Sequence, residues 1–373
     1  LRETKVIGDL MNKEQQNKYE EGAPKKSKNG LWLIFFILIA AISIWAVAAQ
    51  SRSFSAAEFF SYISTASPVW LFCAVTSTVM FILFEGMALM VTCRILGHKM
   101  RFRHGYIYSA SDIYFSSITP SATGGQPASA YFMIKDGMSG MTATAALLSN
   151  LCMYLVSLIV VSVICFTVRP DIFLAYSTAS KIIIICGGVA LTALTSFNVL
   201  LLANSRILHR ICRGGISLLC KLRILRNKEK RLTKLDLSIE SYRESTAMIS
   251  KHKKGLWVTF LFNFLQRLSQ LAVSMFVFIA TTGRSFWEAM DVLFVQGYTV
   301  LGSSCIPIPG AIGISDYLML DGFSTIMSEA EAVNLELLSR SLSFYLCVFI
   351  CGISVLIRYF TIKKRGKNND RLL

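Results

Sequence analysis

Five ionisable side chains stand out because they lie within apolar stretches or near helix-breaking residues. Glu85 is embedded in FILFEGMALM, Arg267 in NFLQRLSQ, and Arg340 in the last long apolar stretch. Asp112 and Asp316 lie in two segments that also contain proline and glycine. A charge at the centre of a membrane-inserted helix costs about 2.5–3.5 kcal/mol, so such residues are usually functional or paired. The three acids among them, Glu85, Asp112 and Asp316, could contact a cationic group of a ligand or exchange protons, and the sequence does not distinguish these two roles.

Arg267 belongs to a polar face within its apolar stretch. Four polar residues recur at spacings of three and four, which places them on one side of a helix: Asn263, Gln266, Arg267 and Gln270. Such a face must contact protein or water. Because a guanidinium forms fork-like bonds to phosphate oxygens, we predict Arg267 and Gln270 as ligand contacts, with Glu85 as a further candidate. A structural Arg267–Glu85 ion pair is an equally good interpretation.

The sequence contains none of the common catalytic or metal-binding motifs. It has no Gly-rich phosphate loop followed by Lys-Ser/Thr, no G-x-S-x-G elbow and no HExxH. The four histidines lie in basic segments, and the ten cysteines form no CxxC pair. We therefore predict no catalytic residue, no metal site and no cofactor.

The elements that position these residues are predicted to be membrane-spanning helices. Hydrophobic residues make up 54% of the 373-residue chain and charged residues only 16%, whereas soluble domains carry about 25% charged residues. Apolar runs of about 20 residues suffice to cross a bilayer. We predict an all-α polytopic membrane protein with about six full spans, at 31–49, 68–93, 138–168, 178–203, 255–282 and 335–360. The first resembles a signal peptide, but its length favours a retained helix.

Basic residues are concentrated in segments outside these spans. Of 38 Lys and Arg, 31 fall at 1–30, 94–105, 205–254 and 358–373. The positive-inside rule assigns such segments to the cytoplasm, so we predict both termini there. The net charge of +16 then indicates contact with an anionic membrane leaflet and not with nucleic acid.

Two segments do not fit as full spans, because each consists of two short apolar arms joined by proline and glycine. They are residues 105–137 and 286–325, and they hold four of the seven prolines of the chain. Proline clashes with a continuing helix, and glycine permits the turn. A broken helix at membrane depth must be covered by protein or line a cavity. We therefore predict two re-entrant hairpins.

The two predicted hairpins resemble each other in sequence. SSITP at 116–120 parallels SSCIP at 303–307, and a tyrosine follows each break. On the predicted topology the hairpins enter from opposite sides, so residues 31–204 and 255–360 form an inverted repeat. The discontinuous helices of such repeats form the substrate site in transporters. Two interfacial loops that happen to contain proline are the alternative interpretation.

Three segments lie outside the predicted membrane halves. Residues 1–30 are polar and mixed in charge, which predicts a disordered cytoplasmic N-terminus, and 361–373 form a basic cytoplasmic tail. Residues 205–254 hold 14 Lys and Arg against four acids. The helical spacing at 214–225 and 233–249 favours amphipathic helices on an anionic leaflet, although a solvated linker explains the same charges.

The sequences at the two breaks are similar to those of a known family. TPSATGGQPASAYFMIKDG and IPIPGAIGISDYLML resemble the two signatures of the lysylphosphatidylglycerol synthase/flippase transmembrane family. That family includes the membrane half of the bacterial multiple peptide resistance factor, also called phosphatidylglycerol lysyltransferase. The resemblance covers residues 31–360. It places the family's motif residues, as candidate substrate contacts, at Pro120, Gly124, Gly125, Gln126, Pro127, Pro307, Pro309, Gly310, Gly313 and Asp316.

The resemblance implies a multi-pass lipid flippase of the bacterial plasma membrane, with membrane phospholipids as partners and a link to antibiotic resistance. Full-length relatives are held to move aminoacylated phosphatidylglycerol to the outer leaflet. A glycolipid or a polyprenyl-phosphate carrier is a further candidate cargo. The sequence leaves a homo-oligomer open.

This chain departs from the family pattern in two ways. Many relatives carry Glu at the position of Asp316 and a Glu–Arg pair in the span after the first motif, where this chain has LLSNLCMYL with Asn150. Little sequence follows the last span, so we expect no soluble synthase domain and no lysyl transfer by this chain alone. The alternatives are a lysyl-tRNA-dependent phosphatidylglycerol lysyltransferase or a membrane subunit of it, and a scaffold that recruits partners through residues 205–254.

Overall fold

The computed structural model describes residues 63–369 except 120–121, 222–227, 305, 307 and 312. The predicted N-terminal segment 1–30 and first span 31–49 therefore lie outside the described residues, as do Pro120 and Pro307. Every regular element in the described part of the chain is a helix. The predicted all-α class is confirmed.

Five described helices are long and apolar enough to cross a membrane. They are α4 (Pro68–Ile95), α7 (Gly140–Val168), α9 (Thr178–Ala203), α12 (Lys253–Thr282) and a continuous span from Glu329 to Ile362. That last span combines α15 (Glu329–Arg340), a π-helical turn (Ser341–Leu346) and the start of α16 (Cys347–Asn369). The chain is thus a polytopic membrane protein, as its composition predicts.

Local sequence signals explain where many of these helices begin. Pro68 occupies the first turn of α4, where its missing N–H has no partner to lose. Elsewhere a serine immediately precedes the helix, and its hydroxyl accepts a backbone N–H of the first turn. These capping serines are Ser139, Ser177, Ser285 and Ser328.

Each predicted hairpin consists of two helices separated by a break. The first segment forms α5 (Phe102–Ile118) and α6 (Gly125–Lys135). The second forms α13 (Phe286–Ser303), a short 3-10 turn at Pro309–Ala311 and α14 (Ile314–Phe323). Both interruptions fall at the predicted proline and glycine positions. Their re-entry into a bilayer stays a prediction.

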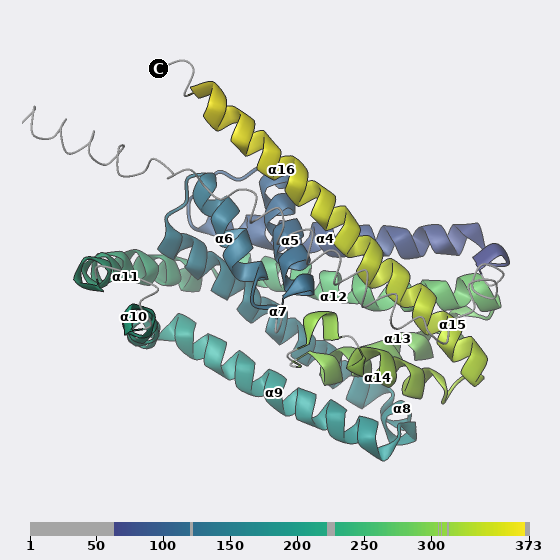
Figure 1. Cartoon of the computed structure of the whole chain (residues 1–373). Coiled ribbons are helices and arrows are strands. Elements are labelled where there is room, and N and C mark those ends of the chain that lie inside the picture. Colours follow the sequence, from purple (N-terminus) through teal and green to yellow (C-terminus); the bar gives the residue numbers. More distant parts are fainter. Residues whose placement is uncertain are drawn as a thin grey trace, which may run out of the picture. The chain divides into compact units, whose positions relative to one another are not determined.

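The two halves pack in the same order. In the first, α4 packs on α5, α5 on α6 and α6 on α7; in the second, α12 packs on α13, α13 on α14 and α14 on α15. The most extensive contact joins α4 to α12 (Figure 1). The N–H of Ser67 also donates to the carbonyl of Ala280 over 2.7 Å, which ties the start of α4 to the end of α12. This matching order is the arrangement that an inverted repeat requires.

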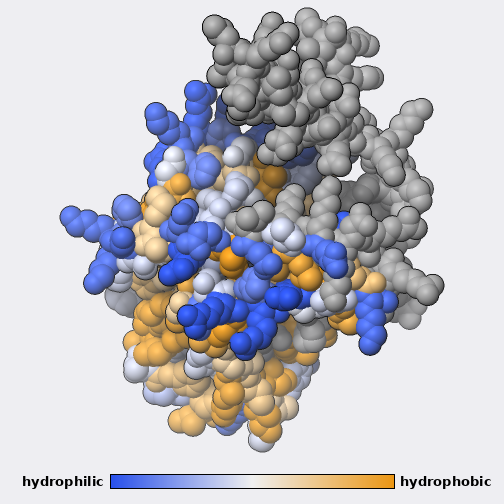
Figure 2. Space-filling model, turned by 90° about the vertical axis from the view of Figure 1, so that its left-hand side faces the viewer, coloured by the Kyte–Doolittle hydropathy of each residue, from blue (hydrophilic) through white to orange (hydrophobic). Residues whose placement is uncertain are grey.

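The basic helices gather at one end of the described spans. Helices α10 (Ser205–Lys221) and α11 (Lys228–Lys251) lie there, whereas α8 (Pro170–Ala175) and the start of α15 lie at the other end (Figure 1). Hydrophilic side chains cover much of the end that carries α10 and α11, and apolar side chains cover the adjoining surface (Figure 2). Tyr242 of α11 donates to the Leu201 carbonyl over 3.1 Å, and burial raises the pKa of this phenol to about 12.

Small residues allow the closest helix crossings. A Cβ added at Gly86 of α4 would lie 3.0 Å from the Gly105 carbonyl carbon of α5. On the other side of the molecule, Gly187 of α9 lies against the backbone of Leu301 and Gly302 in α13. Close crossings at small residues are typical of helices packed within membranes. They place α5 and α13 firmly against their neighbouring spans.

Candidate functional site

A cavity of about 630 Å³ lies where the two hairpin breaks approach each other. Its wall is built by α5 and the end of the first break, by α13, α14 and the second break, and by residues of α4, α7, α9, α12 and the last span. Elements from both halves of the chain therefore enclose one space. The size lies within the range of ligand pockets, about 300–1,000 Å³.

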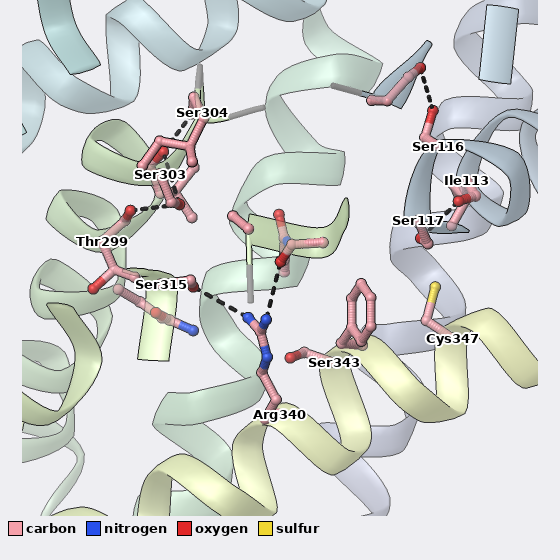
Figure 3. A pocket seen from close by; sticks show the side chains of 18 of the residues that line it. Ile113, Ser116, Ser117, Thr299, Ser303, Ser304, Ser315, Arg340, Ser343 and Cys347 are labelled. Atoms are coloured by element: carbon pink, nitrogen blue, oxygen red, sulfur yellow. Dashed lines mark hydrogen bonds between the residues drawn. The ribbon is translucent and has the colours of Figure 1, made fainter. Parts of the chain in front are cut away.

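Hydroxyl groups line much of this cavity (Figure 3). Several of them donate to the carbonyl one turn earlier in their own helix; Ser117 bonds Ile113 and Ser303 bonds Thr299, each over 2.7 Å. Because a hydroxyl keeps acceptor and donor capacity, these groups can still serve a polar ligand. The serines and threonine of the wall are Ser116, Ser117, Thr299, Ser303, Ser304, Ser315 and Ser343.

Arg340 holds the second break in place. Its Nη1 donates to the Ser315 hydroxyl over 3.1 Å and its Nη2 to the Gly310 carbonyl over 2.9 Å (Figure 3). Its Nε lies 3.0 Å from Oδ1 of Asp316, with both side chains almost fully buried. Gly310 has φ 60° and lies against the ring of Phe344, a conformation and a spacing that suit only glycine. The last span therefore fixes the backbone of the break.

Asp316 also caps the helix that follows the break. Its Oδ2 accepts the N–H of Gly313 over 2.7 Å, at the N-terminus of α14. An acid in the first turn is favourable there, because the helix dipole is positive at that end. One carboxylate thus joins the break, α14 and the last span. It lies behind Arg340 and is not part of the cavity wall.

Arg267 is the second guanidinium of the cavity wall. It is 4% exposed, lies over the ring of Tyr154 at 4.8 Å and donates to the Gln270 side chain. Its Nε is buried without a hydrogen-bond partner. Among the described residues, no carboxylate forms an ion pair with it. The Glu85 carboxyl group interacts with it electrostatically but forms no ion pair with it.

The rest of the polar face of α12 is occupied by protein. Gln266 donates to Oε2 of Glu85 over 2.9 Å, and Asn263 donates to Oδ1 of Asn150 over 3.0 Å. The Glu85 carboxylate thus accepts a hydrogen bond from an amide and not from the Arg267 guanidinium. Asn150 provides Asn263 with a neutral partner.

In the first hairpin, hydrogen bonds join the residues on the two sides of the break. Asp112 accepts from Ser116 over 3.1 Å and from Gln126 over 3.3 Å. Gly124 donates its N–H to the Thr119 hydroxyl over 2.9 Å. The Asp112 carboxylate therefore links α5 to the start of α6, in a structural position near the cavity.

The structure brings only part of the predicted site to the cavity wall. Arg267, Gln270 and Gly310 line it. The other candidates whose side chains are described lie outside the wall: Glu85, Gly124, Gly125, Gln126, Pro127, Gly313 and Asp316. No signal in the sequence distinguishes the serines, and Arg340 stands out only as a charge within a predicted span. Among the described residues, no group of His, Cys, Asp and Glu could hold a metal ion.

Over residues 33–351, the sequence matches the family described as the lysylphosphatidylglycerol synthase TM region. The chain belongs to this family. The match includes both breaks, Arg267 and Arg340, so the resemblance inferred from the break sequences is confirmed. The family's own description places the chain in the membrane region of such proteins.

Two relatives of this family member are known only as UPF0104 membrane proteins. One, from Pyrococcus horikoshii, is 24% identical over 65% of this chain and 73% of its own length. The other, from Archaeoglobus fulgidus, is 24% identical over 83% of this chain and 92% of its own length. Their names describe membrane proteins and specify no substrate.

Proposed function

We propose that this member of the lysylphosphatidylglycerol synthase TM family is a lipid flippase, in which a phosphate-bearing headgroup passes through the cavity between the two breaks. The cargo we favour is aminoacylated phosphatidylglycerol or a related anionic lipid or glycolipid, in a bacterial plasma membrane. The observation that carries the proposal is Arg267, a buried guanidinium that lines the cavity, forms no ion pair and has its Nε without a hydrogen-bond partner.

The electrostatics of the cavity favour an anion. Two arginines line the described wall, and of these two only Arg340 forms an ion pair, with Asp316. A buried charge without a partner is costly, and a lipid phosphate would supply the opposite charge together with acceptors for guanidinium N–H groups. The surrounding hydroxyls can bond glycerol or sugar oxygens. The wall thus fits a polar, negatively charged headgroup.

The position of the cavity favours passage over mere storage. Its wall takes backbone from two broken segments that, on the predicted topology, enter from opposite sides of the membrane. Discontinuous helices of inverted repeats surround the substrate in transporters of known mechanism. A headgroup held between the breaks is therefore placed where movement of either half exposes it to one side.

Substitution of Arg267 tests the proposal. Purified protein in liposomes with fluorescent phosphatidylglycerol is assayed for transfer between leaflets by chemical quenching of the outer leaflet. Arg267→Gln removes a charge-assisted hydrogen bond to the lipid, which is worth about 1.5–3 kcal/mol. Lipid transfer by this variant should therefore be about ten- to a hundredfold slower, or its lipid binding weaker by the same factor.

Arg284→Gln is the matched control, because Arg284 is partly exposed, pairs with Glu331 and does not line this cavity. It should transfer lipid at the wild-type rate. Wild-type protein that moved no anionic or aminoacylated lipid, or an Arg267→Gln variant as active as wild type, would overturn the proposal.

The family description favours one further candidate, because it names a synthase. As a lysyltransferase or a membrane subunit of one, the protein would transfer lysine from lysyl-tRNA to phosphatidylglycerol. Incubation of the purified protein with both compounds distinguishes the two functions. Formation of lysylphosphatidylglycerol would favour the enzyme.

A further inference from the structure

A second buried carboxyl group lies next to the Asp316–Arg340 ion pair. Glu336 is one turn before Arg340 on α15 and is 4% exposed, as is Asp316. The side chains of Glu336 and Asp316 lie close together. Two acids thus share one arginine directly behind the cavity wall.

Two buried carboxyl groups that lie close together are not readily ionised at the same time, because their like charges repel each other. Asp316 already accepts from Gly313 and pairs with Arg340 through its two oxygens. Both contacts use the Asp316 oxygens as acceptors. Glu336 is therefore the group that remains to hold the proton.

The groups that face Glu336 give this proton a specific effect. They are Asp316 of α14, Arg340 of α15 and Tyr345 of the π-helical turn. Helix α12, which also packs on α15, contributes Arg267 to the same cavity. With Glu336 neutral, the charges of Arg340 and Asp316 cancel. With Glu336 ionised, this cluster of three side chains carries one net negative charge, which opposes an anion bound at Arg340.

We propose that Glu336 is a proton-binding site coupled to the anionic ligand of the cavity, so that a proton and a phosphate headgroup bind together. This inference rests on the proposed flippase function and gives it a driving force, a proton gradient. Proton uptake converts the Glu336 carboxylate to the acid and breaks no other bond. Loss of the proton restores the negative charge and weakens the hold of both arginines on phosphate.

The direction of the pH dependence follows from this coupling. At low pH Glu336 is protonated and binding is tight; as the pH rises and the proton is lost, binding weakens. Binding of short-chain phosphatidylglycerol to purified protein should fall about tenfold between about pH 6 and pH 9, since one buried charge nearby has an effect of that order. Glu336→Gln, which imitates the protonated acid, should bind at all these pH values as wild type does at low pH.

Glu331→Gln is the matched control, because Glu331 lies on the same helix near its exposed start. It should keep the wild-type pH dependence. A measurement on wild-type protein alone also tests the coupling: addition of the same lipid in weak buffer should cause proton uptake, detected with a pH-sensitive dye. In liposomes, a pH gradient should drive net lipid transfer by wild type but not by Glu336→Gln.

Lipid binding that is independent of pH and takes up no proton would overturn this inference and leave the flippase proposal intact. Absence of lipid binding and transfer by wild type at every pH would instead overturn the flippase proposal. A pH dependence that persists in Glu336→Gln would assign the proton to another group. Dependence on Na⁺ in place of protons would also reject the Glu336 site.

Discussion

Arg340 and Asp316 form a buried ion pair that joins the last span to the second break. Replacing one member of such a pair leaves the other charged and without compensation, at a cost of about 3–5 kcal/mol. Each of these side chains also bonds backbone at the break, Arg340 to Gly310 and Asp316 to Gly313. The pair therefore determines the conformation of the cavity wall as well as its charge.

We predict that Asp316→Asn and Arg340→Gln each lower the thermal stability of the purified protein strongly. The double variant should lose less stability than the sum of the losses of the two single variants, because neither charge is then left without a partner. Thermal unfolding in detergent measures all three. Arg243→Gln, which removes an exposed pair with Glu240, should leave the melting temperature unchanged. Strict additivity of the two single losses would contradict the coupling.

At this scale the sequence predicted some residues of the site and missed others. Arg267 was predictable because a charge inside an apolar stretch is conspicuous. Glu336 and Arg340 share a helix face through their spacing of four, but the carboxylate that meets them belongs to α14, and sequence spacing does not reveal it.

Glycine in α6 sets how closely the two arms of the first hairpin approach. A Cβ at Gly125 would overlap the side chains of Asp112 and Ser116 and would lie 2.6 Å from the Asp112 carbonyl oxygen. The backbone carbonyl cannot move aside without displacing α5. Gly188 of α9 offers a contrast, since a Cβ there would lie 3.7 Å from a Leu301 methyl group, at ordinary contact distance.

We predict that Gly125→Ala destabilises the protein by about 1–3 kcal/mol, the usual cost of overpacking, and impairs lipid transfer. Gly188→Ala should be neutral or slightly stabilising, because alanine favours a helix over glycine by up to about 1 kcal/mol. Melting temperatures and transfer rates of the two variants provide the comparison. Equal behaviour of the two would show that the arms of the hairpin do not need their close approach.

Most elements were predictable because their signals are local. Pro and Gly interrupt both hairpins at the predicted positions, and the described spans begin and end within several residues of the predicted limits. The π-helical turn after Arg340 had no such signal. It follows from packing, since Gly310 lies against Phe344 of that turn and Arg340 reaches the break from its first edge.

The whole molecule presents its basic helices at one end of the described spans, where hydrophilic side chains gather (Figure 2). The five described spans alternate in direction, so the connections before α10 and after α12 fall at opposite ends. The distribution of Lys and Arg assigns the first of these ends to the cytoplasm. This orientation is a prediction of charge alone.

Reporter fusions test the orientation. A green fluorescent protein fused after Asn204 should be fluorescent and alkaline phosphatase at that position inactive. Fusions after Gly283 should show the reverse, because that residue follows α12 at the other end. The opposite pattern would place both termini outside and reverse the direction of the proposed proton coupling.

The cavity itself was beyond prediction from the sequence. It is enclosed by segments from both halves of the chain, and its existence depends on how far apart their packing leaves the two breaks. Sequence similarity between the breaks indicated that they are related. Only the fold shows that they face a common space and that Arg267 and Arg340 both line it.

The π-helical turn has a consequence for the angular phase of the last span. An α-helix advances about 100° per residue, and a π-helical turn accommodates one residue more than an α-helical one. The extra residue is absorbed within this turn, so the helix on either side of Ser341–Leu346 keeps nearly the same angular phase. Deletion of one residue there should therefore restore a regular helix and leave Arg340 facing Asp316. Relatives with one residue fewer at this turn should still carry the guanidinium at the break.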